Sequence, residues 1–506
     1  MFESAELGHK IDDATYEREA KKLRGALLDA QYDLLEDRSF PVVVLVNGID
    51  GAGKGETVNL LNEWLDPRHV RSIAFDAPSA DELARPPMWR FWQNLPPKGK
   101  IGVLFGNWYT DPITHRATGR TRRSELPGQI ERIRRFEKLL DDDGALLVKL
   151  WFHLSKKGMK QRLEELEKNK LTRWRVTKHD WKNFAAYDKF AKVSEVVLRE
   201  TSTGEAPWVV IDGSDSNYRE ITAAKTLLTA IQGQLEVSRA HRAEAAAAKR
   251  KSSSAKVAPT NTALIQSIDT ARILRDLPFT ERLSKEKYAT RVVKAQGELA
   301  RLAREPRMRE HSVMVVFEGM DAAGKGGAIR RVTQALDARR FTVVPIAAPT
   351  DEERAQPYLW RFWRHLPKHG RFVIFDRSYY GRVLVERVEG FASQAAWSRA
   401  YAEINDFEEQ LVESGTIVVK CFLAITKDEQ LRRFKEREKT KYKQYKITPE
   451  DWRNRKKWDD YVVAASDMID RTSTSIAPWA VIEANDKHLA RVRVIEAIAK
   501  QMRERL

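Results

Sequence analysis

Two glycine-rich segments have the residue types and spacing of a phosphate-binding loop. The second, GMDAAGK from Gly319 to Lys325, fits G-x-x-x-x-G-K and follows the apolar run VMVVFE. In such a loop, backbone N–H groups at a helix N-terminus surround phosphate oxygens, and the lysine adds a positive charge. The alternative is a glycine-rich structural turn. The sequence predicts a phosphate site formed by Gly319, Ala322, Ala323, Gly324, Lys325 and Gly326.

One residue of the usual loop is missing. Gly326 stands where a serine or threonine commonly follows the lysine and gives a hydroxyl ligand to Mg²⁺. Asp321, inside the loop, can replace that ligand, because a carboxylate can hold Mg²⁺ directly or through water. Alternatively, Asp321 contacts a phosphate acceptor through the metal, or it caps backbone N–H groups in the turn.

A second acidic motif, FDRSYYGRVLVER (375–387), begins where an apolar run ends at Asp376. Open parallel sheets bind ligands at the carboxyl ends of their strands. We therefore expect Asp376 to be the second carboxylate ligand of Mg²⁺. Arg377 and Arg382 are expected to neutralise phosphate oxygens, since guanidinium groups form bidentate contacts. Glu386 is either a further metal or acceptor contact or an ion-paired helix residue.

The segment LRRFKEREKTKYKQYKITPEDWRNRKKWDDY (431–461) is dense in lysine and arginine. Such a segment can close over a polyanion as a helical lid and exclude water. The alternative is a solvated, charged helix. Our candidates for phosphate contacts are Arg433, Arg437, Lys443 and Lys446.

The first half of the chain repeats these motifs incompletely. Its loop GIDGAGK (48–54) precedes the second loop by 271 residues and keeps Asp50 and Lys54. We align the following segment, FGNWYTDPITHR (105–116), with a one-residue difference near residues 97–105. This alignment replaces Asp376 by Gly106, Arg377 by Asn107, Arg382 by Pro112 and Glu386 by Arg116. Because a carboxylate is lost and a charge reversed, we predict that the first half is inactive or very weak.

Strands and helices are expected to alternate around these motifs. Charged helical stretches (about 14–37 and 281–305) precede the two loops. Further apolar runs lie at 101–105, 145–154 and 207–212, and again at 371–376, 416–425 and 478–483. This order predicts an α/β fold with two tandem domains, each a parallel sheet sandwiched by helices.

The stretch between the halves is rich in alanine, lysine and serine, and predicts a helix tail running into a flexible linker. We expect an N-terminal domain at 1–239, a linker at 240–262 and a C-terminal domain at 263–506. The tryptophan block WRFWRHLP, with Trp360 and Trp363, is expected to pack in the core rather than form a wall beside a nucleotide.

Composition narrows the class of partner. Lys and Arg total 89 against 72 Asp and Glu, a formal charge of +17. This favours nucleic acid, an acidic membrane or polyphosphate as partner, unless the surface is simply solvated. The single cysteine, Cys421, excludes an internal disulfide and is expected in the core. We expect no membrane span, because no apolar run approaches ~18 residues. A signal pattern is also not expected, and the predicted location is the cytoplasm.

Together the motifs resemble the polyphosphate kinase 2 family. The resemblance rests on GMDAAGKGG, PYLWRFWRHLP, FDRSYYGRVLVERV and the stretch from ITPEDW to WDDYVVAASDMIDRTST. It covers nearly all of the second half and, more loosely, the first half. The family implies a phosphate-loop kinase fold with a lid, Mg²⁺ as cofactor, and the metal- and phosphate-handling residues Asp321, Lys325, Asp376, Arg377 and Arg382.

Members with two fused domains resemble class II, the polyphosphate:AMP phosphotransferases, which phosphorylate AMP to ADP. The resemblance therefore implies inorganic polyphosphate and AMP as partners, without nucleic acid or membrane. Oligomeric state stays open, including a homo-oligomer. Two other hypotheses are an ATP-dependent nucleoside monophosphate kinase and a non-catalytic scaffold that binds polyanions. Donor choice and turnover separate them from polyphosphate-dependent transfer.

Overall fold

The computed structural model describes residues 1–252 and 272–506, without the side chains at 245, 246, 248–252, 272, 442, 443 and 446. The chain divides into two compact units. The first comprises Met1–Pro78, Arg90–Pro259 and Thr350–Trp360, and the second comprises Ser79–Trp89, Thr260–Pro349 and Arg361–Leu506.

Each unit contains a five-stranded, fully parallel sheet. The strands of the first are β1 (Val42–Gly48), β2 (Val70–Ala74), β3 (Ile101–Phe105), β4 (Leu146–His153) and β5 (Trp208–Asp212). Those of the second are β6 (Ser312–Gly319), β7 (Phe341–Pro345), β8 (Phe372–Asp376), β9 (Thr416–Ala424) and β10 (Trp479–Glu483). The first sheet has the order β2-β3-β1-β4-β5, and the second has the equivalent order β7-β8-β6-β9-β10. The predicted α/β architecture of two parallel sheets is confirmed.

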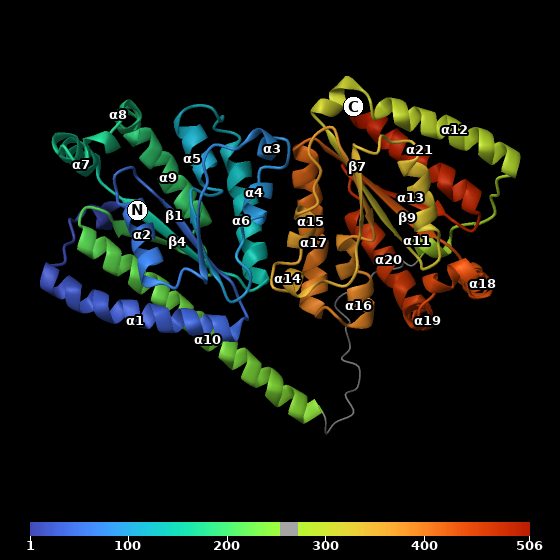
Figure 1. Ribbon diagram of the computed structural model, residues 1–506, viewed down its shortest axis with the longest axis horizontal. Coiled ribbons are helices and arrows are strands. Elements are labelled where there is room, and N and C mark those ends of the chain that lie inside the picture. The colour runs from blue at the N-terminus through green and yellow to red at the C-terminus, as the bar shows by residue number, and fades with distance from the viewer. Residues whose placement is uncertain (253–271) are drawn as a thin grey trace. The chain divides into compact units, whose positions relative to one another are not determined.

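Helices cover both faces of each sheet (Figure 1). The longer helices of the first half are α1 (Asp13–Asp37), α2 (Lys54–Trp64), α5 (Thr110–Ala117), α6 (Leu126–Asp142), α7 (Lys156–Lys168), α8 (Lys178–Ala185), α9 (Tyr187–Thr201) and α10 (Ser216–Ser252). Helices α1, α2 and α10 lie on one face of the first sheet, and α5, α6 and α9 lie on the other (Figure 1).

The second sheet is covered in the same way. The longer helices of this half are α12 (Lys285–Leu302), α13 (Lys325–Thr333), α16 (Val385–Glu389), α17 (Gln394–Glu413), α18 (Lys427–Lys439), α19 (Pro449–Lys456), α20 (Trp458–Thr472) and α21 (Lys487–Arg505). Helices α12, α13 and α21 cover one face, and α17 and α20 cover the other (Figure 1).

Short helices complete the chain. They are α3 (Ala80–Leu83), α4 (Trp89–Trp92), α11 (Arg272–Arg275), α14 (Asp351–Arg354) and α15 (Trp360–Trp363), with the 3-10 turns η1 (Glu3–Glu6), η2 (Arg173–Arg175), η4 (Pro306–Arg309), η5 (Tyr379–Arg382) and η6 (Lys441–Lys446). The first 13 positions of the expected linker, 240–252, form the end of α10, and 253–262 lie outside the described residues.

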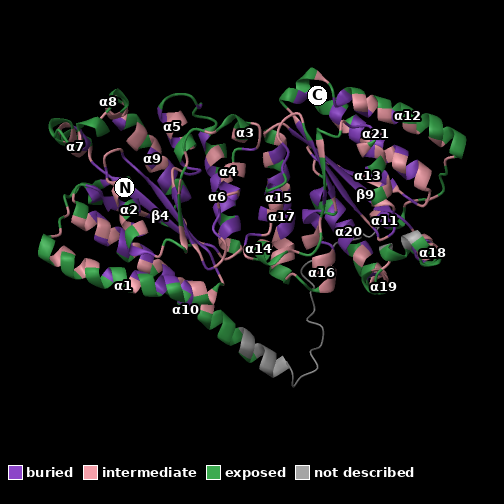
Figure 2. Ribbon diagram, viewed as in Figure 1, coloured by how far each residue is buried: buried purple, intermediate pink, exposed green. Residues whose placement is uncertain are grey.

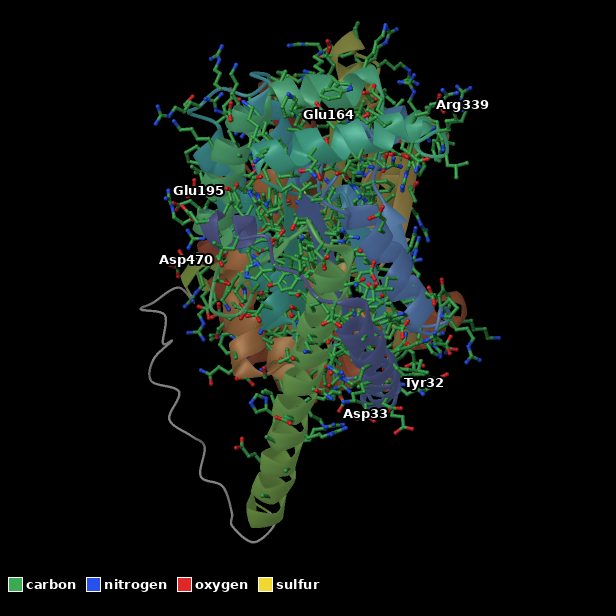
Figure 3. The ribbon with its side chains drawn as sticks, turned by 90° about the vertical axis from the view of Figure 1, so that its left-hand side faces the viewer. Tyr32, Asp33, Glu164, Glu195, Arg339 and Asp470 are labelled. Carbon is green, nitrogen blue, oxygen red and sulfur yellow. The ribbon has the colours of Figure 1, made fainter. Side chains whose placement is uncertain are left out.

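The central strands form because both sheet faces are buried, which requires continuous apolar runs. All seven residues of β1 and the first seven of β6 are buried, whereas helices expose their outer sides (Figure 2). Charged outer side chains also join elements: Asp33 on α1, labelled in Figure 3, pairs with Arg239 of α10 at 2.9 Å. Trp363 is fully buried and packs on Phe407 with ring centroids 5.2 Å apart, as expected of a core residue. Cys421 is also buried.

The two units correspond position by position with a constant offset of 271, so the one-residue difference expected near residues 97–105 is wrong. Val42 pairs with Ile101 in the first sheet, and Val313 pairs with Phe372 in the second. The backbone angles agree, since φ is +69° at Gly106 and +64° at Arg377. The residues in the places of Asp376, Arg377, Arg382 and Glu386 are therefore Phe105, Gly106, Asp111 and His115. Two carboxylates and two arginines are lost at these positions, and one carboxylate, Asp111, is gained.

A buried lysine fixes the turn after β8. Lys420 in β9 donates to Glu408 at 2.7 Å and to the Thr472 carbonyl at 2.6 Å. Glu408 accepts hydrogen bonds from the hydroxyls of Tyr379 and Tyr380, at 2.8 and 2.7 Å. Burial lowers the pKa of Lys420, and Glu408 opposes this shift. The pair therefore positions the tyrosines that follow Asp376 and Arg377.

The first unit has the same arrangement, in which Lys149 donates to Glu137 at 2.8 Å. Because both units keep it, we assign this network to the fold rather than to chemistry. No helix within residues 1–252 and 272–506 has the length and apolarity that a membrane crossing needs.

Candidate active site

The loop between β6 and α13 has a backbone that its sequence dictates. Gly319 has φ +138°, and a Cβ atom there would lie 2.3 Å from the Leu423 carbonyl oxygen, so no other residue fits. Gly324 has φ +110° and precedes the first residue of α13. Ala322 has φ +62°, which is uncommon for a residue with a side chain. The loop thereby directs the N-terminus of α13 into a pocket.

This pocket has a volume of about 730 Å³ and is lined by the loop, the ends of β7 and β8, and parts of α18, α19 and α21. Its basic lining residues are Lys325, Arg330, Arg331, Arg377, Arg433, Arg437, Lys487 and Arg491. Its acidic lining residues are Asp321, Asp376, Glu436, Glu450 and Asp451. Eight cations against five anions make the pocket suited to a phosphate chain.

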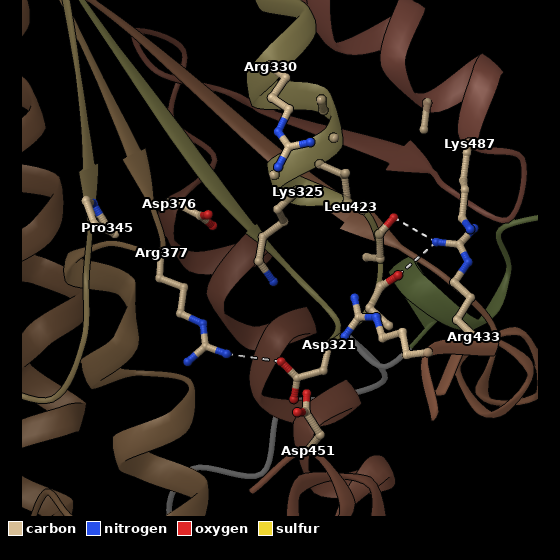
Figure 4. Close-up of a pocket in the computed structure, with 18 of the residues that line it drawn as sticks. Asp321, Lys325, Arg330, Pro345, Asp376, Arg377, Leu423, Arg433, Asp451 and Lys487 are labelled. Atoms are coloured by element: carbon tan, nitrogen blue, oxygen red, sulfur yellow. Dashed lines mark hydrogen bonds and ion pairs between the residues drawn. The ribbon is translucent and has the colours of Figure 1, made fainter. Parts of the chain in front are cut away.

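Lys325 lies at the centre of the site, and Asp376 and Arg377 reach it from the end of β8 (Figure 4). The Lys325 amine donates to the Gly319 carbonyl at 2.8 Å. Burial lowers its pKa, with a further lowering by Arg377, whereas Asp321 and other nearby carboxylates oppose the shift. The loop therefore holds its one lysine close to the position where phosphates would enter.

Asp321 is held on both of its oxygens. Arg377 contacts Oδ1 at 3.2 Å (Figure 4), and the Asn454 side-chain amide donates to Oδ2 at 2.9 Å. Asp321 and Asp376 both line the pocket, so the structure brings together the two carboxylates expected to hold Mg²⁺. Gln430 donates to the Asp321 backbone carbonyl at 3.2 Å. Sequence reasoning missed Asn454 and Gln430, because an amide inside a basic segment carries no signal by itself.

Glu318, the last side chain before the loop, was also missed. It is 4% exposed and accepts a hydrogen bond from the Ser378 hydroxyl at 2.8 Å. Burial raises its pKa to about 7, while Lys325 and Ser378 oppose the shift. A carboxylic acid inside an otherwise apolar strand run was the signal that the sequence offered. Glu318 links the strand before the loop to the residue after Arg377.

Arg433 is buried although it lines the pocket, and its expected role as a phosphate contact stays a prediction. Its Nη1 donates to the carbonyls of Ala322 and Ala323, both at 2.9 Å (Figure 4). Its Nη2 donates to the carbonyls of Ala484 and Asn485, and its Nε donates to Glu429 at 2.5 Å. An arginine has five N–H donors, and here each has an acceptor. Arg433 therefore ties the backbone of the phosphate loop to the segment that follows β10.

The other expected site residues fall into two groups. Arg437 and Gly326 line the pocket, whereas Arg382 and Glu386 do not belong to its lining and form an ion pair at 2.8 Å. The side chains of Lys443 and Lys446 lie outside the described residues. Lys487 and Arg491 also line the pocket, and sequence reasoning missed them. The signal available was the basic sequence KHLAR at the start of α21.

In the first unit, the same loop backbone faces different side chains. Asp50 and Asn183 keep their contact at 2.9 Å, and Lys54 pairs with Asp50 at 3.2 Å. Glu56, however, stands where the second unit has Gly327, and its carboxylate pairs with Arg219 at 2.9 Å.

Arg219 is 2% exposed and occupies the position of Ala490. Its guanidinium lies against the loop, because a Cβ on Gly53 would be 2.2 Å from the Arg219 Cζ. Arg162 and Arg175 add weaker contacts to Glu56, at 3.4 and 3.6 Å. A carboxylate with three arginines thus occupies the region that Gly327 and Ala490 leave open in the second unit.

Comparison with known proteins agrees with this architecture. The family model for polyphosphate kinase 2 matches residues 10–239 and again 282–506. A polyphosphate:AMP phosphotransferase of Pseudomonas aeruginosa is 55% identical over 498 residues, covering 98% of each chain. A polyphosphate:AMP phosphotransferase of Acinetobacter johnsonii is 40% identical, covering 94% of this chain and 95% of that one.

A solved structure is similar over the full length as well. The crystal structure of a polyphosphate kinase 2 from Pseudomonas aeruginosa superposes with a TM-score of 0.87 at 52% identity, covering 100% of this chain and 99% of that one. The two-fold match of the family model corresponds to the two sheets of identical strand order. On this evidence the chain belongs to the polyphosphate kinase 2 family, with two copies of the family's domain in tandem.

Proposed function

We propose that this chain transfers the terminal phosphoryl group of inorganic polyphosphate to AMP, giving ADP, and that the second unit carries the reaction. The observation that supports this most strongly is that one cationic pocket is lined by Asp321, Lys325, Asp376 and Arg377 together. The relatives that match over the full length are named polyphosphate:AMP phosphotransferases. In our assignment the domains are residues 1–239 and 263–506, joined by 240–262.

The residues suit phosphoryl transfer, in which catalysis is mainly positioning and charge neutralisation. An oxygen of the AMP phosphate attacks the terminal phosphorus of polyphosphate. The bond from that phosphorus to the bridging oxygen breaks, and the shortened chain leaves with the electron pair. AMP needs no general base, because its phosphate oxygens are already anionic at neutral pH. Lys325 and the loop N–H groups would bind the transferred group, and Arg377 would offset the charge of the two phosphates as they meet.

Mg²⁺ fits the two carboxylates of this pocket. Magnesium in phosphate-transfer sites takes one or two protein carboxylates and completes its shell with water and substrate oxygens. Asp321 and Asp376 would hold it, with Asn454 keeping the Asp321 carboxylate in orientation. The bound ion would supply positive charge against the phosphate oxygens. The proposal places the reaction in the cytoplasm, which suits a chain whose single cysteine allows no internal disulfide.

The proposal also makes the first unit non-catalytic. Phe105 and Gly106 replace Asp376 and Arg377, and the pair of Glu56 with Arg219 fills part of the loop region. Either change alone would weaken phosphate binding: one removes the metal carboxylate, and the other fills the space beside the loop with a paired carboxylate and guanidinium.

The test is ADP formation from long-chain polyphosphate, Mg²⁺ and AMP without ATP, by the parent and by Asp376→Asn. The parent should form ADP, and the variant should lose this activity while it keeps its thermal unfolding midpoint. Activity only with ATP would replace the proposal with an ordinary nucleotide kinase. Polyphosphate binding without turnover of any donor would point to a scaffold instead.

A further inference from the structure

The first unit has a pocket of its own, and none of the residues that line it belongs to the phosphate loop of that unit. It has a volume of about 900 Å³ and lies among the end of α5, the start of α6 and one side of α9. Five basic and two acidic residues line it: Arg116, Arg123, Arg134, Lys189 and Lys192, with Glu131 and Glu200. Neither the phosphoryl transfer nor the fold accounts for this cluster of charge.

Most of these cations have no acidic partner. Within residues 1–252 and 272–506, Arg116, Arg123, Lys189 and Lys192 form no ion pair, and Arg134 makes one long contact with Glu131 at 3.8 Å. Unpaired cations around one cavity raise the local concentration of anions. The apolar part of the lining comes from Ala117, Leu126, Ile130, Val193 and Val196, and Thr118, Gly119 and Pro127 complete it. The pocket thus combines an aliphatic floor with a cationic rim.

The same place in the second unit is filled. There Arg387, the counterpart of Arg116, pairs with the buried Asp467 at 2.8 Å and donates to the Tyr401 hydroxyl at 2.8 Å. Its guanidinium also stacks on Trp397, 4.4 Å from the ring centroid. In the first unit, Val196, Ile130 and Leu126 replace Asp467, Tyr401 and Trp397. The smaller side chains open the cavity, and the loss of the aspartate leaves Arg116 without its partner.

The charge of these positions also changes sign. Where the first unit has five basic and two acidic residues, the matching positions of the second have two basic residues, Arg387 and Arg471, and three acidic ones, Glu389, Asp460 and Asp467. Loss of function alone gives no reason for lysines and arginines to gather around an apolar floor in the first unit. The coincidence of both changes indicates a ligand with an apolar body and an anionic end.

We propose that this pocket binds a nucleoside phosphate, with the base on the floor beside Ile130 and Val196 and the phosphate on the rim beside Arg116, Lys189 and Lys192. A volume of this size holds one such molecule. The ligand sits in a unit to which we assign no catalysis, so its binding is a function additional to phosphoryl transfer. The choice of AMP and ADP as probes rests on the proposed reaction, whereas the binding is independent of turnover.

The experiment counts AMP bound per full-length chain by equilibrium dialysis, without polyphosphate and at low salt. The parent is compared with Ile130→Tyr/Val196→Asp, which introduces the side chains of the second unit. The parent should bind one AMP more per chain than this variant, and ADP should behave in the same way. Adenosine and inorganic tripolyphosphate, each with half of the ligand's chemistry, should bind at least about tenfold more weakly to the site.

Charge reversal gives a second, milder test on exposed residues. Lys189→Glu/Lys192→Glu should weaken the extra site at least about tenfold at low salt and less at high salt, because exposed charges are screened. Lys22→Glu on α1 reverses an exposed lysine outside the pocket and should leave it unchanged.

Equal AMP stoichiometry and affinity in the parent and both pocket variants would overturn the proposal. Equal binding of tripolyphosphate and AMP at the extra site would overturn the assignment of an apolar ligand body. A chain that makes no ADP from polyphosphate would refute the proposed reaction and leave this binding result standing.

Discussion

The loop after β1 and the loop after β6 hold their glycines in the same conformations but face different side chains. Gly48 and Gly319 have φ +145° and +138°, and each lies where a Cβ would strike the neighbouring strand. In the second unit Gly327 and Ala490 leave room beside the loop, whereas in the first Glu56 and Arg219 take that room and pair with each other. A phosphate loop is therefore a backbone that permits binding, and the residues around it decide whether binding occurs.

The largest effect is expected at Arg377, because it separates the two units most clearly. Arg377→Gly introduces the residue of the first unit, and its φ of +64° suits glycine, so the fold should be kept. Loss of this cation should lower kcat on the order of 100-fold. Arg382→Ala is the matched control, since Arg382 pairs with Glu386 away from the pocket lining. An equal loss in the control would restore Arg382 to the site.

The next largest effect is expected on stability, when the hydrogen bonds of Arg433 to the phosphate loop are removed. Arg433→Ala would leave three buried backbone carbonyls, the half-buried Asn485 carbonyl and Glu429 without this donor. It should lower the free energy of unfolding of the second unit by about 3 to 5 kcal/mol. The counterpart change, Arg162→Ala, removes one long contact with Glu56 and should cost less than about 1 kcal/mol. Thermal or denaturant unfolding measures both. Similar losses of unfolding free energy in the two variants would mean that Arg162 supports its loop as Arg433 does.

Glu318 should make the stability of the second unit depend on pH, whereas the first unit has Asn47 at this position. Its pKa in the folded protein is about 7, above the ordinary 4.5, so the native state binds this proton more tightly than the unfolded chain does. The free energy of unfolding should therefore fall as pH rises from about 4.5 to about 7, by on the order of 3 kcal/mol from this group. Glu318→Gln should flatten that part of the curve. A variant with the parent's slope would show that Glu318 does not titrate there.

The smallest expected effect is a gain of phosphate binding by the first unit. Glu56→Gly with Arg219→Ala gives the first loop the residues of Gly327 and Ala490, and should add weak binding of inorganic tripolyphosphate, measured by calorimetry. Turnover should not rise, because Phe105 still stands in the place of Asp376. If the double variant binds no additional tripolyphosphate, the pair of Glu56 and Arg219 is not what closes the first loop.

The fold followed from sequence wherever a strand is buried on both faces. The edge strands β2 and β7 were missed because their residues are largely exposed and form no apolar run, and β7 ends at Pro345. The alignment of the two halves failed by one residue for a similar reason. Gly106 and Arg377 share a backbone conformation that their side chains do not reveal.

The site was predicted where motifs are local. Asp321, Lys325, Asp376 and Arg377 lie within short segments at strand ends, and the structure brings them to one pocket. Sequence could not assign Arg433, because its five acceptors are mostly backbone carbonyls from the loop and from the end of β10. Nor could it predict the contact between Glu56 and Arg219, which are 163 residues apart and meet only when the sheet forms.

The most direct test of the account compares the two loop lysines in one assay. Lys325→Ala and Lys54→Ala make the same change in the same backbone, and ADP formation from polyphosphate and AMP is measured for each. We expect Lys325→Ala to lower kcat by at least about 100-fold, because it removes the cation at the transferred phosphate, and Lys54→Ala to leave it unchanged. A comparable loss in Lys54→Ala, with the fold intact, would contradict the claim that only the second loop does the chemistry.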